Sequence, residues 1–311
     1  MSTPASADRV VVQAPGKLNL FFAVGAAQPD GYHDVASVYQ AVSVFEEVTA
    51  TPADEVTISV SGSVDVDTVP LDDRNLAVRA VRLLARETGY RGGARLHVDK
   101  HVPVAGGMGG GSADAAAALV ACDALWGTGV PSARLHELAA RLGADVPFAL
   151  HGGTAIGTGR GDRLSPALAH GRFDWVLAFD DGGLSTPVVY AELDRLRAQS
   201  QLDIAPKRHA PEVDHGVLRA LRLGDAEALA RVVGNDLQQA ACALHPALAT
   251  LLDAGVAYGA LAGLVSGSGP TVAFLVPDAD AGAALAGRLT ADGRQARHVH
   301  GPVRGARVIS A

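Results

Sequence analysis

The sequence predicts an α+β protein made of two domains, in which helices and sheets pack as two layers. Three observations predict this class. The chain has 311 residues and is 48% hydrophobic, which is enough to bury a sizeable core. Segments typical of strands and of helices follow one another in mixed order. The composition shifts near residues 163–173, so we expect one domain over residues 1–165 and a second over residues 166–311.

The first domain is expected to open with strands and to continue with alternating helices and strands. Branched, aromatic or alternating apolar residues predict strands over 9–25, 30–53, 55–62 and 93–105. Apolar residues at helical spacing predict helices over 75–89, 112–126 and 131–143. Ser112 is expected to be the N-cap of the second helix, with Asp114 in its first turn. Residues 144–166 are expected to form a turn and a strand.

The second domain is expected to mix strands and helices in the same way. Thr186-Pro187 is typical of an N-cap and first helical residue. The polar stretch 200–216, with two prolines, predicts an exposed loop, and further helices are expected to about residue 255. The remaining elements are a strand over 174–179, a turn and buried strand over 263–278, a helix over 279–293 and a strand-like end over 296–310.

The net charge and the cysteines indicate which partners and which cellular compartment to expect. The net charge is −7 and no run of Lys or Arg occurs, which argues against nucleic acid or an anionic membrane as the main partner. We find no signal-peptide pattern and no apolar run of membrane-spanning length, about 18–20 residues. Cys122 and Cys242 are expected to be buried free thiols, as suits a reducing compartment. We therefore expect a cytoplasmic protein that acts on a small molecule.

A glycine-rich stretch precedes the helix predicted at residue 112. Five glycines and one methionine occupy the six positions 106–111. A glycine turn between a strand and a helix exposes backbone N–H groups at the helix N-terminus, which is a site for phosphate. Gly110-Gly111-Ser112 lacks the lysine of a Walker A loop, and the spacing from Gly107 does not fit a dinucleotide fingerprint. The alternative is a tight turn with close helix packing, which one or two glycines would satisfy.

Three other features are ambiguous alone and become informative only when they are considered together with the glycine-rich stretch. Lys17 lies in an apolar strand with Asn19 on the same face, although a lone lysine is usually solvated. Asp145 follows a helix stop, where an aspartate commonly caps the backbone. The motif SGSGPT, residues 266–271, is a second glycine turn before a strand, and alone it fits any hairpin.

Together these motifs resemble the GHMP kinase superfamily, from about residue 10 to the C-terminus. PVAGGMGGGSADAA is similar to its phosphate loop and SGSGPTVAF to its C-terminal glycine motif. APGKLNLFFAVG, DGYH and LGADVPFALHGGTAIGTGRGD resemble the family that phosphorylates 4-diphosphocytidyl-2-C-methyl-D-erythritol. The resemblance implies an N-terminal βαβ domain like that of a ribosomal protein, and a C-terminal ferredoxin-like domain.

The resemblance implies transfer of the γ-phosphate of ATP to the 2-hydroxyl of that substrate, a step of the non-mevalonate isoprenoid pathway. Asp145 would be the general base, and Lys17 would lie between Asp145, the hydroxyl and the γ-phosphate. Asn75 and Lys100 match positions that contact the adenine nucleotide. The phosphates would be held by the loop from Pro103 to Ala113, which comprises Pro103, Val104, Ala105, Gly106, Gly107, Met108, Gly109, Gly110, Gly111, Ser112 and Ala113.

For the acceptor, the resemblance implies that Tyr32 and Tyr190 stack on cytosine and that His33 bonds its edge. Asn19 would share the polar part of the substrate, and Thr186 either contacts it or only caps a helix. Ala113 stands where many relatives have a second serine, so Mg²⁺ is expected to be held mainly by phosphate oxygens and water, with no assigned protein ligand.

Other functions remain open at this point. Another GHMP kinase with a different alcohol, such as homoserine or mevalonate, would share the loop. An RNA-associated binding module would share the N-terminal architecture, although the net charge of −7 counts against it. A catalytically dead sensor would not need both Lys17 and Asp145. The sequence leaves open whether the protein is a monomer or a homodimer.

Overall fold

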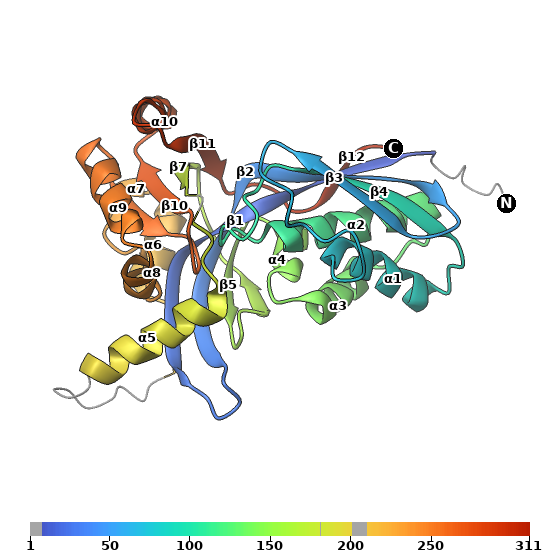
Figure 1. The fold of residues 1–311 in the computed structure, drawn as a ribbon, viewed down its shortest axis with the longest axis horizontal. Helices are drawn as coiled ribbons and strands as arrows, with labels where there is room; N and C mark the ends of the chain where they lie inside the picture. The colour runs from blue at the N-terminus through green and yellow to red at the C-terminus, as the bar shows by residue number, and fades with distance from the viewer. Residues whose placement is uncertain (1–7, 181, 201–209) are drawn as a thin grey trace.

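The protein is built on two sheets, and two long strands of the first run through most of its length (Figure 1). The computed structural model describes residues 8–180, 182–200 and 210–311. Both the α+β class and the two-part architecture expected from the sequence are confirmed. Most of the predicted loop at 200–216 lies outside the described residues.

The first sheet carries the N-terminal half of the chain. Its main path runs in the order β12-β1-β2-β4-β3, and β5 and β8 also pair with β2 and β1. The strands β3 and β4 are parallel and enclose α1, which is a βαβ unit. The strands of this sheet are β1 (Val10–Ala27), β2 (His33–Ala53), β3 (Thr57–Gly62), β4 (Gly93–Lys100), β5 (Thr154–Thr158), β6 (Arg163–Pro166), β8 (Gly234–Asn235) and β12 (Arg307–Ser310).

Four helices cover one face of this sheet (Figure 1). Asn75 caps α1 with its side chain, and a left-handed Gly89 ends the helix. The longest helix, α2, is alanine-rich because it packs against both the sheet and α1 at short range. The helices are α1 (Leu76–Thr88), α2 (Gly110–Trp126), α3 (Ser132–Leu142) and α4 (Val146–His151).

The second sheet is antiparallel and has the order β11-β7-β10-β9. Together with α5 and α10 these strands follow the β-α-β-β-α-β order of a ferredoxin-like fold, as expected. The strands are β7 (Phe173–Phe179), β9 (Ala262–Val265), β10 (Val272–Val276) and β11 (Gln295–Gly301). The helices are α5 (Thr186–Ser200), α6 (His215–Leu223), α7 (Ala226–Ala230), α8 (Gln238–Leu244), α9 (Ala247–Ala257) and α10 (Ala279–Ala291).

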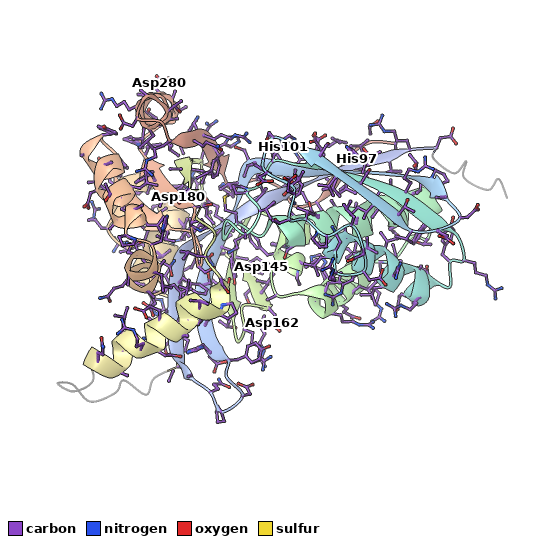
Figure 2. All side chains as sticks on the ribbon, viewed as in Figure 1. His97, His101, Asp145, Asp162, Asp180 and Asp280 are labelled. Atoms are coloured by element: carbon purple, nitrogen blue, oxygen red, sulfur yellow. The ribbon has the colours of Figure 1, made fainter. Side chains whose placement is uncertain are left out.

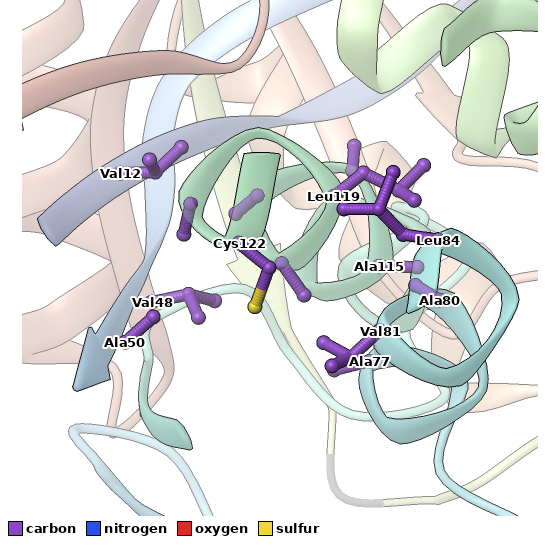
Figure 3. Close-up of a cluster of buried hydrophobic side chains, with 14 of the residues drawn as sticks. Val12, Val48, Ala50, Ala77, Ala80, Val81, Leu84, Ala115, Leu119 and Cys122 are labelled. Atoms are coloured by element: carbon purple, nitrogen blue, oxygen red, sulfur yellow. The ribbon is translucent and has the colours of Figure 1, made fainter. Parts of the chain in front are cut away.

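The first core forms where α2 meets α1 and the sheet (Figure 3). Leu119 and Cys122 on α2 are fully buried there, in one cluster with Val81 and Leu84 of α1 and Val48 of β2. Another cluster joins the two sheets, because Leu18 and Leu20 of β1 pack in the same group as Trp175 of β7. The long strand β1 therefore contributes to both parts of the protein.

Four sequence-based expectations are corrected by the structure. The N-cap of α2 is Gly109 rather than Ser112, and the helix already begins at Gly110. Asp114 consequently lies beyond the first turn, where it pairs with a lysine instead of the helix dipole. Residues 146–151 form the short helix α4 within a stretch expected to be a turn and strand. Thr186 is the first helical residue of α5 rather than its N-cap.

The division at residues 165 and 166 stays a prediction. The strand β12, at the end of the chain, pairs with β1 of the first sheet. Cys122 is a buried free thiol as expected, whereas Cys242, also free, is only half-buried. Within the described ranges no single helix is long and apolar enough to cross a membrane, and only the bent pair α8 and α9 meets that test together.

Candidate active site

Two neighbouring cavities meet at the glycine stretch. The first, of about 400 Å³, is lined by residues from both halves of the chain, including Lys17, Asp145 and Tyr190. The second, of about 390 Å³, is lined by Asn75, Lys100 and most of the stretch 103–112. Gly107, Gly109 and Ser112 line both. Cavities of this volume suit small-molecule ligands, and a group that lies across the shared glycines would touch both occupants.

Lys17 and Asp145 form the charged centre of the first cavity. The Lys17 ammonium lies 3.9 Å from an Asp145 carboxylate oxygen, and Figure 2 shows Asp145 near the junction between the two halves. Burial lowers the pKa of Lys17, and the Asp145 charge opposes that shift. Asp145 occupies the N-cap position of α4, yet its side chain makes no capping hydrogen bond. Its carboxylate therefore lines the first cavity without a hydrogen bond to the helix backbone.

A hydrogen-bond relay fixes the lysine. Lys17 Nζ donates to Asn19 Oδ1 at 2.6 Å, so the two side chains share one face of β1 as expected. Asn19 Nδ2 in turn donates to Ser37 Oγ at 2.8 Å, on the neighbouring strand β2. The relay leaves the ammonium in place with remaining N–H donors for a ligand, because a lysine carries three.

The glycine stretch is held by contacts that exclude side chains. Gly107 has a φ of 75°, and a Cβ on it would overlap the Ser266 carbonyl of the second glycine turn. Ser266 Oγ donates to the Gly107 carbonyl at 3.2 Å, which joins the two glycine motifs. The Met108 carbonyl accepts from the Lys17 backbone N–H at 3.0 Å, and the Met108 side chain is fully buried. The loop thus links the strand of Lys17 to the C-terminal half.

The start of α2 is open to an anion. Gly109, with a φ of 72°, is its N-cap and supplies no side-chain cap. The first N–H groups of any helix lack intrahelical acceptors and carry partial positive charge. These groups lie beside the residues that both cavities share, Gly109 and Ser112. The arrangement can hold phosphate at the boundary between the cavities.

Lys100 is part of a buried triad beneath the second cavity. Its ammonium contacts Glu46 at 2.8 Å and Asp114 at 2.6 Å, and all three side chains are at most 5% exposed. Burial raises the pKa of Glu46 to about 7, helped by the Asp114 charge and opposed by Lys100. Burial also raises the pKa of Asp114, whose Oδ1 is buried without a hydrogen-bond partner among the described residues. Such an oxygen is the place for a ligand or water donor.

Asn75 lines the second cavity and is buried, and it also has a structural task. Its Oδ1 accepts from the Ala77 N–H at 2.9 Å, and its Nδ2 donates to the Pro70 carbonyl at 2.8 Å. Either amide atom retains capacity for one more hydrogen bond. A role toward the nucleotide for Asn75 or Lys100 stays a prediction.

Of the residues predicted to hold cytosine, Tyr190 belongs to the lining of the first cavity, whereas Tyr32 and His33 do not. Tyr190 lines the first cavity, and its ring centroid lies 5.0 Å from that of His33. Burial raises the pKa of Tyr190 to about 12, and the Asp145 charge adds to the shift. His33 Nε2 lies 3.0 Å from Asp194 Oδ1, which leaves Nδ1 for a ligand. Tyr32 is 56% exposed, and the guanidinium of Arg160 covers one face of its ring.

Thr186 contacts the second glycine turn at the first cavity. The residues of this turn were not among the site residues predicted from the sequence. The Thr186 hydroxyl lies 2.8 Å from Ser268 Oγ, and both residues line the first cavity with Gly267. Asn235 supports this turn from β8, because its Nδ2 donates to the Gly267 carbonyl at 2.7 Å. The motif SGSGPT carried the signal for Gly267 and Ser268, whereas nothing local marked Asn235.

Comparisons with known proteins assign the family. The chain matches the family models described as GHMP kinases N terminal domain, over residues 75–153, and GHMP kinases C terminal, over residues 217–295. It is 60% identical over 304 residues to the 4-diphosphocytidyl-2-C-methyl-D-erythritol kinase of Leifsonia xyli subsp. xyli, covering 97% of this chain and 99% of the relative. The chain belongs to the 4-diphosphocytidyl-2-C-methyl-D-erythritol kinase family.

Further relatives agree with this membership. The kinase of the same name from Clavibacter michiganensis subsp. michiganensis is 57% identical and covers 99% of each chain. A crystal structure of 4-(cytidine 5'-diphospho)-2C-methyl-D-erythritol kinase matches with a TM-score of 0.75 and 30% identity, over 93% of this chain and 98% of that one. A homoserine kinase from Cytophaga hutchinsonii has the same TM-score at 18% identity, and it shares the fold alone.

Membership confirms the two-domain GHMP kinase architecture and identifies the chain as a small-molecule kinase. It favours an enzyme over the RNA-associated binding module. The glycine stretch lies within the matched N-terminal part, and the second glycine turn lies within the matched C-terminal part. The individual roles of the site residues stay predictions.

The buried triad predicts a pH dependence of stability. The folded-state pKa of Glu46 is raised above its ordinary value of 4.5 to about 7. The stabilisation of the folded state that comes from the proton on Glu46 is therefore complete below pH 4.5 and is lost as pH rises through 7. Glu46→Gln mimics the protonated form, so its stability relative to wild type should rise between pH 5.5 and 8.5, by on the order of 1 kcal/mol. Urea unfolding at both pH values measures this.

Glu47→Gln is the matched control, because Glu47 points to the opposite face of β2. Its effect on the free energy of unfolding should be the same at the two pH values. A constant difference between Glu46→Gln and wild type across this range would contradict the assignment of a proton to the triad.

The close contact between Gly107 and Ser266, which joins the two glycine motifs, predicts that one added methyl group at Gly107 weakens nucleotide binding. Gly107→Ala would place Cβ against the Ser266 carbonyl, and a left-handed backbone alone costs a non-glycine residue about 1–2 kcal/mol. Nucleotide affinity, measured by calorimetry, should fall by about tenfold or more. Gly287→Ala, on α10 with open space around the added carbon, should leave affinity unchanged. Equal nucleotide affinity for the two variants would show that the contact between the glycine motifs does not shape the nucleotide site.

Proposed function

We propose that this protein transfers the γ-phosphate of ATP to the 2-hydroxyl of 4-diphosphocytidyl-2-C-methyl-D-erythritol. One observation carries the proposal: two cavities share a glycine-lined boundary, and Lys17 and Asp145 face that boundary from one side. Phosphoryl transfer needs an acceptor and a donor placed in line, with positive charge around the transferred group. The shared glycines allow such close approach because no Cβ intervenes.

In the proposed mechanism Asp145 accepts the proton of the acceptor hydroxyl. The carboxylate is 30% exposed within the cavity and makes no capping bond, so a hydroxyl can reach it. Lys17 supplies positive charge between Asp145 and the transferred phosphoryl group, where negative charge develops. Asn19 orients Lys17 through the 2.6 Å hydrogen bond and lies close enough to contact the acceptor.

The second cavity is the proposed site of ATP. The uncapped start of α2 would hold the phosphates at the boundary, with the stretch from Pro103 to Ala113 around them. The base would lie deeper, near Asn75 and Lys100. The left-handed φ of Ala105, 55°, is a strained conformation in this loop, and such strain is typical of loops that enclose ligands.

Mg²⁺ is proposed to enter with ATP, held mainly by phosphate oxygens and water. Ser112 offers a hydroxyl and Asp114 an unpartnered carboxylate oxygen at the second cavity, and oxygen donors are what this ion prefers. The ion would neutralise charge on the phosphate oxygens. The protein groups would complete its water shell.

The first cavity is the proposed acceptor site. Tyr190 and His33 are adjacent rings, and Thr186 lies on the C-terminal side of the same cavity. Stacking and edge hydrogen bonds are how pyrimidines are held. Phosphorylation of this acceptor would place the protein in non-mevalonate isoprenoid precursor synthesis. A cytoplasmic location and a monomeric or homodimeric state stay predictions.

The substrate is tested by ADP release with Mg-ATP against a panel of alcohols. We expect turnover with 4-diphosphocytidyl-2-C-methyl-D-erythritol and none with homoserine, mevalonate or galactose. Turnover with another alcohol instead would retain the kinase and discard the cytosine site. Nucleotide binding without turnover of any alcohol would favour a sensor.

The base is tested by Asp145→Asn, which keeps the shape of the side chain and removes the proton acceptor. We expect kcat to fall by about 100- to 10,000-fold, because that is the usual contribution of a general base. Calorimetry should show nucleotide affinity within about twofold of wild type, since the first cavity rather than the second holds Asp145. Asp162→Asn, on the adjacent turn and outside that cavity, is the control and should retain kcat. Normal turnover by Asp145→Asn would show that another group takes the proton.

A further inference from the structure

Arg160 provides a positive charge that the mechanism above does not use. Among the described residues that line the first cavity, the charged ones are Lys17, Asp145 and Arg160. Lys17 is engaged by Asn19 and Asp145 at the reacting end. The proposed acceptor, on which this inference rests, carries a diphosphate between its cytidine and its polyol. That group needs a cation of its own, away from the reacting hydroxyl.

The position of Arg160 allows its side chain to contact a ligand in the first cavity. It belongs to the turn between β5 and β6, and the Gly159 carbonyl accepts from the Val35 N–H at 2.7 Å, which docks the turn on β2. Its Cζ lies 3.9 Å from the ring centroid of Tyr32. Arg160 lines the cavity whereas Tyr32 does not, so the guanidinium lies at the cavity's edge against the tyrosine.

The present partner of Arg160 is one that a diphosphate can replace. Arg160 Nη2 donates to Asp30 Oδ2 at 2.8 Å, and both side chains are at least half exposed. Exposed ion pairs of this kind contribute little to stability, so exchange of the carboxylate costs little. A guanidinium presents a planar fork of N–H donors that matches phosphate oxygens, and it is weakly hydrated. The Tyr32 ring lies against the guanidinium, with its centroid 3.9 Å from Cζ.

We propose that Arg160 binds the diphosphate of the acceptor and thereby determines specificity for a nucleoside-diphosphate-linked alcohol over a plain alcohol. In this arrangement the cytidine end lies toward Tyr190 and His33, and the polyol end lies at Lys17 and Asp145. Arg160 is a binding residue for the non-reacting part of the substrate. Its removal should therefore weaken acceptor binding while leaving ATP binding alone.

Steady-state kinetics of Arg160→Gln test the proposal. We expect KM for 4-diphosphocytidyl-2-C-methyl-D-erythritol to rise about 10- to 100-fold, the loss of one bidentate charged contact. KM for ATP should stay within about twofold of wild type, because Arg160 does not line the second cavity. Arg160→Lys keeps the charge without the fork and should recover only part of the loss. Arg163→Gln, an exposed arginine outside the cavity, is the matched control and should change neither KM.

Inhibition by cytidine and by cytidine diphosphate, measured against the acceptor at saturating ATP, separates a phosphate contact from support of the Tyr32 ring. Arg160→Gln should raise the inhibition constant of cytidine diphosphate about tenfold and leave that of cytidine unchanged. An equal rise for both inhibitors would mean that Arg160 acts only through Tyr32, and unchanged constants for both would exclude any role. Absence of wild-type turnover would overturn the proposed function itself, whereas wild-type turnover with an unchanged KM in Arg160→Gln would overturn this inference alone.

Discussion

The close approach of Gly107 to the Ser266 carbonyl is the constraint on which the rest of the site depends. It joins the two glycine motifs, one from each half of the chain, at a distance that no side chain would allow. The neighbouring Met108 carbonyl then fixes the backbone of Lys17, and Gly109 lies against the side chains of both Lys17 and Asp145. The loop that makes this backbone contact therefore also touches the charged pair, starts α2 and lines both cavities.

Lys17 and Lys100 are both buried, but the charged groups around them differ and give the two lysines different roles. Lys17 is buried beside a single carboxylate, and the net effect of burial lowers its pKa. Burial also disfavours the charge of Lys100, but Asp114 and Glu46 outweigh it and raise the pKa of that lysine. The first arrangement leaves a cation whose attraction is available to a ligand. The second neutralises its cation internally, so Lys100 acts as a support beneath α2 more than as a free phosphate ligand.

Much of the fold and part of the site could be predicted because their signals are local. The alternation in β3, the apolar spacing in α1 and the glycine content of 106–111 each reflect their own few residues. The N-cap of α2 was misplaced because glycines, not the serine, adopt the left-handed conformation that starts the helix. The pairing of Asp114 with Lys100, the support from Asn235 and the joining of β12 to β1 depend on residues far apart in sequence, which no local pattern encodes.

In the proposed mechanism, the donor phosphates and the acceptor hydroxyl lie on opposite sides of one glycine boundary. The most direct test is a crystal structure of the chain with a non-hydrolysable ATP analogue and 4-diphosphocytidyl-2-C-methyl-D-erythritol. We predict the terminal phosphate at the start of α2 near Lys17, and the acceptor 2-hydroxyl within hydrogen-bond distance of the Asp145 carboxylate. A terminal phosphate bound away from Gly107 and Gly109, or an acceptor hydroxyl out of reach of Asp145, would contradict it.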